Sequence, residues 1–243
     1  EDALPEYGIV VGYHPSVDSA RPADGDESFT YRSVGPRIHI WGGRDRGTMY
    51  GVMAFLEREF GVRFYTPKVT VAPSRRSYAF RGLYRHEAPS LRVRNDFYFE
   101  AFDPIWAARN RQNGAMNLRE QPGGVEGYWA VHTFYPLVPP AEYFDEHPEY
   151  FSLIDGKRTT ERAQLCLTHP DVLRILTARL RERMRSDPGY LIYSVSQNDW
   201  YGACECDACQ AIVAREGSES GPMLWFVNQV ADAVREEFPD KYI

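Results

Sequence analysis

The residues best suited to acid–base chemistry follow an apolar stretch, 189–195, where the residue types change abruptly. The polar and aromatic residues that follow it are Ser196, Gln197, Asn198, Asp199, Trp200 and Tyr201. Asp199 could act as a general acid or base, and Gln197 and Asn198 could hydrogen-bond to hydroxyl or amide groups of a ligand. Trp200 offers a ring for stacking. The alternative is that Asp199 only caps the turn after a strand.

Two further groups of polar residues are candidates for ligand contacts. Arg85 and His86 are donors that suit sugar hydroxyls or a carboxylate, and Glu87 is a second candidate acid. Ion pairing within the fold is an equal alternative for each of them. His132 lies in a loop rich in aromatic residues, where a histidine either fills space with its hydrogen bonds made or contacts a ligand.

The four cysteines are unevenly spaced along the chain: Cys166 stands alone, whereas Cys204, Cys206 and Cys209 share the string CECDAC. Neighbouring parallel strands lie about 4.8 Å apart, so we expect the CECDAC loop to approach Cys166. A tetrahedral structural zinc site, one or two disulfides, and free thiols are the alternatives. In each case the cysteines fasten a loop, because no neighbouring base would activate a nucleophilic thiolate.

The first 78 residues predict a small α/β domain that precedes these candidates. Residues 7–12 and 37–41 have the pattern of strands bounded by turns. Apolar residues recur at helical spacing over 47–60, and 62–67 and 70–80 return to strand-like composition. The string GGRDRG at 42–47 has neither the dinucleotide-binding spacing nor the Lys-Ser/Thr of a P-loop, so nucleotide binding is not expected.

Residues 79–243 predict the first half of a (β/α)8 TIM-type barrel, with a doubly wound open sheet as the alternative. Strand candidates are 80–88, 113–118, 163–168 and 189–199, and helix candidates are 103–113, the stretch from Pro170, and 221–238. Short helical turns are expected within 139–151. A fifth strand begins at Tyr242, so we expect the chain to be part of a longer protein. Barrel enzymes place their reacting groups where strands end, which is where Asp199 falls.

Composition limits the class of partner. The formal net charge is −6 and no basic block is present, which argues against a nucleic-acid binder. No apolar run reaches the roughly 20 residues of a membrane-spanning helix, so no membrane span is expected. Aromatic residues make up 14% of the chain, which fits sugar binding as well as an ordinary core.

Several long strings are specific enough to suggest a family. They are RGTMYGVMAFLEREFGVRFYTP, FRGLYRHEA, HTFYPLVPPAEYFDEHPEYFSLIDGKR, AQLCLTHPDV, SVSQNDWYGACECDAC and GPMLWFVNQVADAVREEFPDKYI. Together they resemble a bacterial group of proteins with a domain of unknown function, similar to family 67 α-glucuronidases and family 20 β-hexosaminidases. The resemblance implies a small α/β domain ahead of a catalytic barrel, in a secreted or periplasmic protein that degrades polysaccharides.

In family 20 enzymes an Asp-Glu pair after the fourth barrel strand orients the substrate acetamide and protonates the leaving group. Asn198 and Asp199 stand at the similar positions here, so this chain departs from the acetamide-assisted pattern at both of them.

These observations predict a glycoside hydrolase acting on an acidic or N-acetylated oligo- or polysaccharide. The expected catalytic residues are Asp199 and Glu87, and the expected substrate-binding residues are Arg85, His86, His132, Asn198 and Trp200. No cofactor is expected to be required, and a structural zinc at Cys166, Cys204, Cys206 and Cys209 is one alternative, with disulfides as another. The alternative function is a non-catalytic carbohydrate-binding or structural module.

Overall fold

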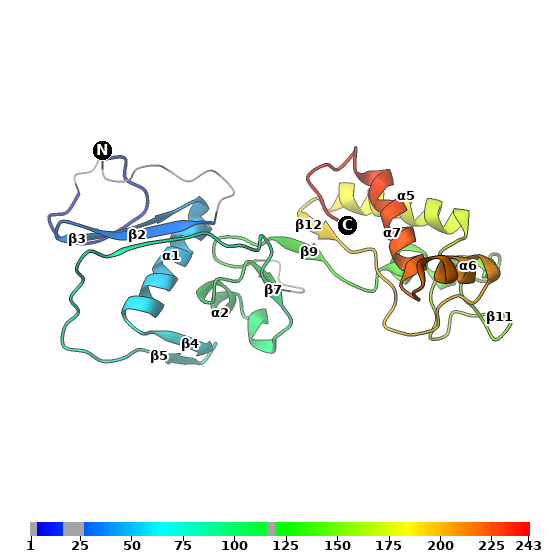
Figure 1. Cartoon of the computed structure of the whole chain (residues 1–243), viewed down its shortest axis with the longest axis horizontal. Coiled ribbons are helices and arrows are strands. Elements are labelled where there is room, and N and C mark those ends of the chain that lie inside the picture. Colours follow the sequence, from blue (N-terminus) through cyan, green and yellow to red (C-terminus); the bar gives the residue numbers. More distant parts are fainter. Residues whose placement is uncertain (1–3, 17–26, 116–119) are drawn as a thin grey trace. The chain divides into compact units, whose positions relative to one another are not determined.

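The computed structural model describes residues 4–16, 27–115 and 120–243, which pack as two compact units, 1–126 and 127–243 (Figure 1). Each unit is described by itself below. The domain boundary expected at residue 78/79 is a different division and stays a prediction. Within the described residues, no helix combines the length and apolar character needed to cross a membrane.

The first unit is built on a mixed sheet with the strand order β1-β3-β2-β6. Its elements are β1 (Gly8–Val11), β2 (Phe29–Val34), β3 (Arg37–Gly42), α1 (Arg44–Glu59) and β6 (Tyr84–Glu87). β1 runs parallel to β3, and β2 runs antiparallel to both β3 and β6. α1 lies across one face of the sheet in Figure 1, and the contact buries Phe29, Tyr31, Ile40, Tyr50, Ala54 and Phe55.

This sheet confirms the strands expected within 7–12 and 37–41 and the helix expected over 47–60. It also shows that the expectation for 80–88 as the first barrel strand is wrong. β6 pairs antiparallel with β2, with Glu87 opposite Phe29 and Arg85 opposite Tyr31. The physical reason is that β2, which the sequence analysis missed, has a second edge whose backbone groups need a partner.

The rest of the first unit holds short elements. They are the hairpin of β4 (Arg63–Thr66) and β5 (Val69–Val71), the parallel pair β7 (Asn95–Asp96) and β8 (Gly114–Ala115), the 3-10 helix η1 (Phe99–Phe102), and α2 (Pro104–Arg109). α2 begins as its sequence predicts, because the Asp103 carboxylate accepts a hydrogen bond from Trp106 N at 2.8 Å. β8 confirms the start of the strand expected at 113–118, and 116–119 lie outside the described residues.

A buried charged network ties distant segments of the first unit together. The guanidinium of Arg46, which is 2% exposed, lies 2.6 Å from carboxylate oxygens of both Glu27 and Glu126. Glu27 also pairs with Arg94 and accepts a hydrogen bond from Asn113 Nδ2 at 3.0 Å. Each buried charge in this network therefore has an opposite charge beside it, which is the condition for burying it at all.

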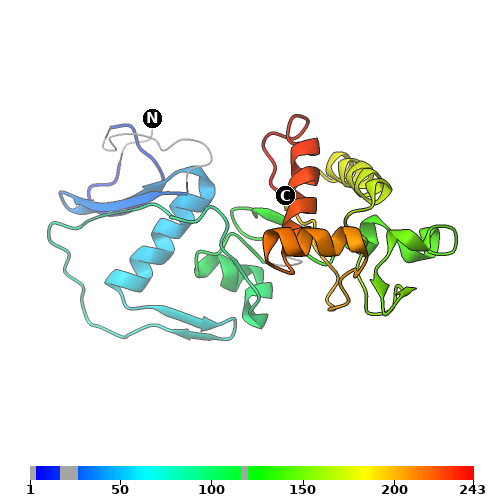
Figure 2. The same cartoon turned by 45° about the vertical axis from the view of Figure 1, so that its right-hand side comes forward.

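The second unit combines short strands with three longer helices. Its elements are β9 (Gly127–Trp129), α3 (Phe134–Leu137), α4 (Pro140–Tyr143), the 3-10 helix η2 (Pro148–Tyr150), β10 (Leu153–Ile154), β11 (Lys157–Arg158), α5 (Pro170–Ser186), β12 (Tyr190–Tyr193), α6 (Asp207–Glu216) and α7 (Gly221–Val234). β9 and β12 are parallel, and Ile192 in β12 makes a parallel bridge to Tyr242. α7 packs against α5 and α6, as Figure 2 shows.

These elements confirm the helices expected from Pro170 and Gly221, the helical turns within 139–151 and the strand within 189–199. The prediction of a strand at 163–168 is wrong. Leu165 makes only an isolated antiparallel bridge to Phe151, and β9, which was not expected, is the strand paired with β12. The described residues show a mixed α/β architecture, and among them no closed barrel forms.

Candidate functional site

The corner that follows β12, residues 194–201, is held in place by hydrogen bonds from hydroxyl groups. Thr133 Oγ1 donates to Ser194 O at 2.8 Å and accepts from Ser196 N at 3.0 Å. In return, Ser196 O accepts a hydrogen bond from Thr133 N at 3.0 Å. The segment before α3 and the end of β12 are therefore held together by reciprocal bonds, and the residues after Ser196 start from a defined position.

His132 is exposed and lies beside this corner. Its Nδ1 is 2.9 Å from Gln197 O, and a carbonyl oxygen only accepts, so Nδ1 carries the proton and donates. Its backbone takes a positive φ of 59°, and its N–H donates to Ser196 Oγ. These bonds aim the ring and leave Nε2 as the remaining polar atom of the imidazole.

Asn198, a predicted ligand-binding residue, is buried. Its side-chain Nδ2 donates to Ala163 O at 2.9 Å, and its backbone N donates to Gln164 Oε1 at 2.8 Å. These contacts give Asn198 a part in holding the corner against the segment around Ala163. Its role toward a ligand stays a prediction.

Gln164 is a residue that the sequence analysis missed. It is buried, and its Nε2 lies within 3.1 Å of the carbonyl oxygens of Asn198, Trp200 and Tyr201. One carboxamide thus fastens the backbone of the whole corner. The sequence signal was a lone polar residue inside the apolar string AQLCL, which is typical of a buried hydrogen-bonding role.

The last three residues of the corner, Asp199, Trp200 and Tyr201, have side chains that are exposed to solvent. Asp199 is exposed, Trp200 is 54% exposed and Tyr201 is 99% exposed. The guanidinium of Arg162 lies over the Trp200 ring, 5.6 Å from its centroid. The corner therefore presents a carboxylate and two aromatic rings to solvent.

An open cleft of about 1180 Å³ adjoins the corner. The polar and aromatic residues that line it are Gln164, Gln197, Trp200, Tyr201, Glu205, Gln210, Glu219 and Ser220. Met223 and Leu224 at the start of α7 give it an apolar patch. Of the expected catalytic and substrate-binding residues, Trp200 is the one that lines this cleft, together with Gln197 and Tyr201 from the same predicted corner.

Arg85, His86 and Glu87 lie in the first unit, on β6. The Glu87 carboxylate is 2.7 Å from the Arg58 guanidinium, and His86 Nδ1 is 2.9 Å from Thr30 Oγ1. Each of these two side chains already has a partner within the first unit, Arg58 on α1 for Glu87 and Thr30 on β2 for His86. Their assignment to catalysis and to ligand binding, with that of Arg85, stays a prediction that this placement does not support.

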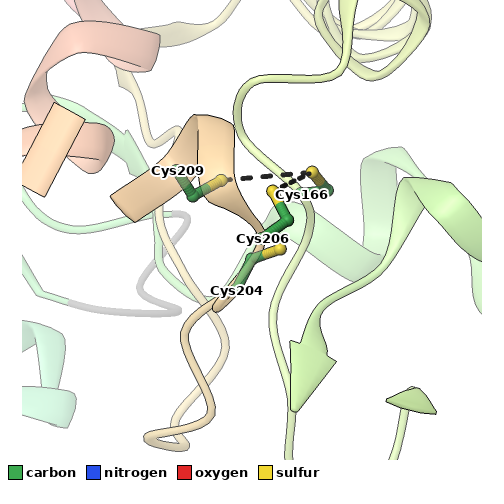
Figure 3. A group of neighbouring side chains, drawn as sticks. All are labelled: Cys166, Cys204, Cys206 and Cys209. Carbon is green, nitrogen blue, oxygen red and sulfur yellow. Dashed lines mark hydrogen bonds between the residues drawn. The ribbon is translucent and has the colours of Figure 1, made fainter. Parts of the chain in front are cut away.

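The four cysteines come together in the second unit as the sequence predicts. Their sulfur atoms all lie within 4.8 Å of one another, and Figure 3 shows them gathered between the segment that carries Cys166 and the first turn of α6. Cys166 Sγ is 3.7 Å from Cys206 Sγ and 4.0 Å from Cys209 Sγ. All four are free thiols, and the cluster is arranged so that it could hold a metal ion.

Donors surround the sulfur atoms. Leu153 N donates to Cys204 Sγ at 3.4 Å, and Arg158 Nη1 lies 3.7 Å from the same sulfur. Thr168 Oγ1 lies 3.3 Å from Cys209 Sγ. A positive charge and N–H and O–H groups at these distances stabilise negative charge on sulfur.

The protons in the cluster are shared unequally. Hydrogen bonds from Cys204 and Cys209 hold the pKa of Cys166 far below its usual range. The hydrogen bond with Cys166 raises the pKa of Cys204 to about 11 and also raises that of Cys209. Four thiolates at this spacing therefore need a cation among them, because each one ionised raises the cost of ionising the next.

The structure thus defines an α/β protein whose second unit places an open cleft beside a four-thiol cluster. The chain belongs to the family described as Domain of unknown function (DUF4838), which matches residues 64–243. No curated protein and no solved structure shows significant similarity to the chain.

Proposed function

We propose that this protein binds an oligo- or polysaccharide in the cleft beyond β12 and hydrolyses its glycosidic bonds. The observation that carries the proposal is the make-up of the cleft. Trp200 and Tyr201 offer exposed rings on which a sugar face can stack, and Gln197 and Gln210 offer amide groups that can pair with hydroxyls. Because Gln164 and Thr133 fix the corner beforehand, little order has to be gained on binding.

The arrangement of strands supports a barrel as the scaffold of this site. In the second unit, β9 pairs parallel with β12, and Tyr242 bridges Ile192 in the same sense. We infer that these strands belong to the first half of a (β/α)8 TIM-type barrel. Such barrels hold their active sites at the carboxyl ends of the strands, and Asp199 follows β12 at that end. The resemblance to family 67 and family 20 glycosidases leads to the same architecture.

Hydrolysis of a glycosidic bond normally uses two carboxyl groups, about 5–5.5 Å apart for retention of configuration and about 6.5–9.5 Å apart for inversion. We assign Asp199 as one of them, either to protonate the leaving oxygen or to activate water. Glu205 and Glu219 line the cleft and are our candidates for its partner. Glu87, in the first unit, stays a catalytic candidate from the sequence alone, and Arg58 already holds its carboxylate.

The charged residues that line the cleft determine which class of sugar it favours. Its lining residues include the carboxylates Glu205 and Glu219 and no lysine, arginine or histidine. An anionic sugar would meet like charges there, whereas an N-acetylated sugar presents an amide that Gln197 and Gln210 can bind. We therefore favour an N-acetylated glycan over an acidic one.

We propose that the metal ion of the four-thiol cluster is a structural zinc. A tetrahedron of Zn–S bonds of about 2.3 Å has sulfur–sulfur edges of about 3.8 Å, close to the 3.7 and 4.0 Å between Cys166 and its partners. Four protein ligands complete the coordination of zinc, so the ion would stabilise the fold without binding substrate. Zinc would also protect the thiols in the secreted or periplasmic location that the family resemblance implies.

A second candidate function is saccharide binding without hydrolysis. The observation that favours it is the position of Asn198, whose amide is committed to Ala163 O and leaves Asp199 without a ligand-facing neighbour like that of family 20 enzymes. Such a protein would keep the aromatic cleft and lack turnover.

A screen of the 243-residue chain against nitrophenyl glycosides and N-acetylated oligosaccharides separates the two. If the protein is a hydrolase, Asp199→Asn lowers turnover by about 100-fold or more and leaves affinity within a few fold. Binding without turnover selects the second candidate. A chain that neither binds nor cleaves any saccharide refutes both.

A further inference from the structure

One wall of the cleft has the cysteine cluster on its other side. Along residues 203–206, cleft residues and cluster residues alternate. Ala203 and Glu205 line the cleft, whereas Cys204 and Cys206 belong to the cluster. Extended backbone sends successive side chains to opposite sides, and Cys206 has such dihedral angles, with φ −64° and ψ 151°.

The same division recurs at Cys166 and at Cys209. Gln164 lines the cleft and Cys166, two residues later, lies in the cluster. In the first turn of α6, Cys209 faces the cluster and Gln210 faces the cleft. Two separate segments, 164–166 and 203–210, therefore give one face to the cleft and the other to the thiols.

An inner pocket makes the connection direct. Cys204 and Cys209 line it together with Gln164, Ala203 and Gln210, which also line the cleft. A change in the spacing of the sulfur atoms must therefore move the residues that shape the cleft.

Apart from the cluster, hydrogen bonds tie residues 202–206 of the wall to other segments of the unit. Glu205 N donates to Leu153 O at 2.8 Å, Glu205 Oε2 accepts from Asp155 N at 2.9 Å, and Gly202 O accepts from Gln164 N at 3.2 Å. The cluster adds a link between Cys166 and Cys209, 43 residues apart in the chain. Metal ligation would fasten that link, and without it the thiols would contribute only weak S–H contacts.

We propose that a zinc ion bound by Cys166, Cys204, Cys206 and Cys209 sets the shape of the cleft, so that saccharide binding depends on metal occupancy. The ion acts through the wall and never contacts the sugar. This inference rests on the proposed function for its sugar ligand, and on the alternation of cleft and cluster residues for its mechanism.

The test uses the full chain, purified with zinc, then stripped with a chelator under reductant, then reloaded. Three quantities are measured: zinc per chain, hydrogen exchange of residues 199–210, and affinity for N-acetylchitotriose. We expect one ion per loaded chain, faster exchange of 199–210 in the stripped chain, an affinity loss of tenfold or more, and recovery of all three on reloading. Cobalt in place of zinc should give thiolate-to-metal charge-transfer absorption, which reports sulfur ligation, and intense ligand-field bands, which report tetrahedral geometry.

Cys206→Ser tests the same link without a chelator, and we expect it to reproduce the stripped state. Ser186→Ala, at the exposed end of α5 and outside both cleft and cluster, serves as its matched control. A loaded chain with no metal, or a stripped chain with unchanged exchange and affinity, overturns the inference. If the loaded chain binds no saccharide, the proposed function fails, and hydrogen exchange alone then decides whether the metal shapes the wall.

Discussion

Gln164 and Asn198 are joined by two hydrogen bonds that run in opposite directions. Asn198 N donates to Gln164 Oε1 at 2.8 Å, and Gln164 Nε2 donates to Asn198 O at 3.0 Å. This pairing imitates the backbone pairing of two strands, although one partner is a side chain. It means that the corner bearing Asp199 is positioned by a residue 34 places earlier in the chain.

Gln164→Leu should therefore destabilise the second unit by about 3 kcal/mol, since it leaves several buried backbone groups of the corner without partners. Urea unfolding measures the change. Gln229→Leu is the matched control, because Gln229 donates only to Trp225 O within α7, and its cost should stay below about 1 kcal/mol. Equal costs for the two variants would contradict the role assigned to Gln164.

Gly202→Ala should be far more damaging than Gly217→Ala. Both glycines have nearly the same φ, 63° and 65°, so both substitutions carry a left-handed backbone penalty of about 1–2 kcal/mol. A Cβ at position 202 would also collide with the backbone oxygen of Arg162, whereas one at position 217 has nothing within 4 Å. Thermal unfolding of the two variants isolates the cost of this clash, and similar stabilities would refute the close packing of the corner.

Arg46→Leu should destabilise the first unit by about 3–5 kcal/mol, because it leaves Glu27 and Glu126 buried without their shared cation. Arg58→Leu removes a partly exposed partner of Glu87 from the same helix and should cost less than about 1 kcal/mol. Denaturant titration compares them. A small effect of Arg46→Leu would show that the network does not form.

Stability of the second unit should fall as the pH rises from about 10 to 12, in part through Tyr135. Burial raises the pKa of Tyr135 to about 12, so the folded state keeps a proton that the unfolded state loses at its ordinary pKa of 10. The favourable contribution is thus fully present below pH 10 and is lost as pH passes through 12. Tyr135→Phe should flatten the slope of stability against pH in this window; an unchanged slope would refute the assignment.

Much of the fold was predictable where local chemistry decides structure. The Asp103 cap, Pro104 and the apolar spacing after Pro170 predicted α2 and α5, which formed as expected. The predictions that were wrong concerned the strands and their pairing. The pattern of 80–88 marks a strand but contains no information on its partner, and pairing with β2 depends on residues more than 50 positions away.

The site was predictable in part for the same reason. The clustering of Cys166 with the CECDAC cysteines was predictable from the residue types, because cysteines in such an arrangement commonly bind a metal ion or form disulfides. Gln164 was missed because a buried amide is recognised only by the carbonyl groups around it, which come from residues 198–201. Glu205 and Gln210 were missed for a similar reason, because the sequence does not show on which side of the chain their side chains lie.

The most direct test of the saccharide cleft is isothermal titration of N-acetylated oligosaccharides into the chain and its Trp200→Ala variant. Tyr98→Ala is the control, because Tyr98 is a 69% exposed aromatic residue of the first unit and is not one of the residues that line the cleft. We predict that Trp200→Ala weakens binding by tenfold or more, as loss of a stacking ring of about 1.5 kcal/mol requires, and that Tyr98→Ala leaves it unchanged. Equal affinity of Trp200→Ala and the unaltered chain would contradict the account.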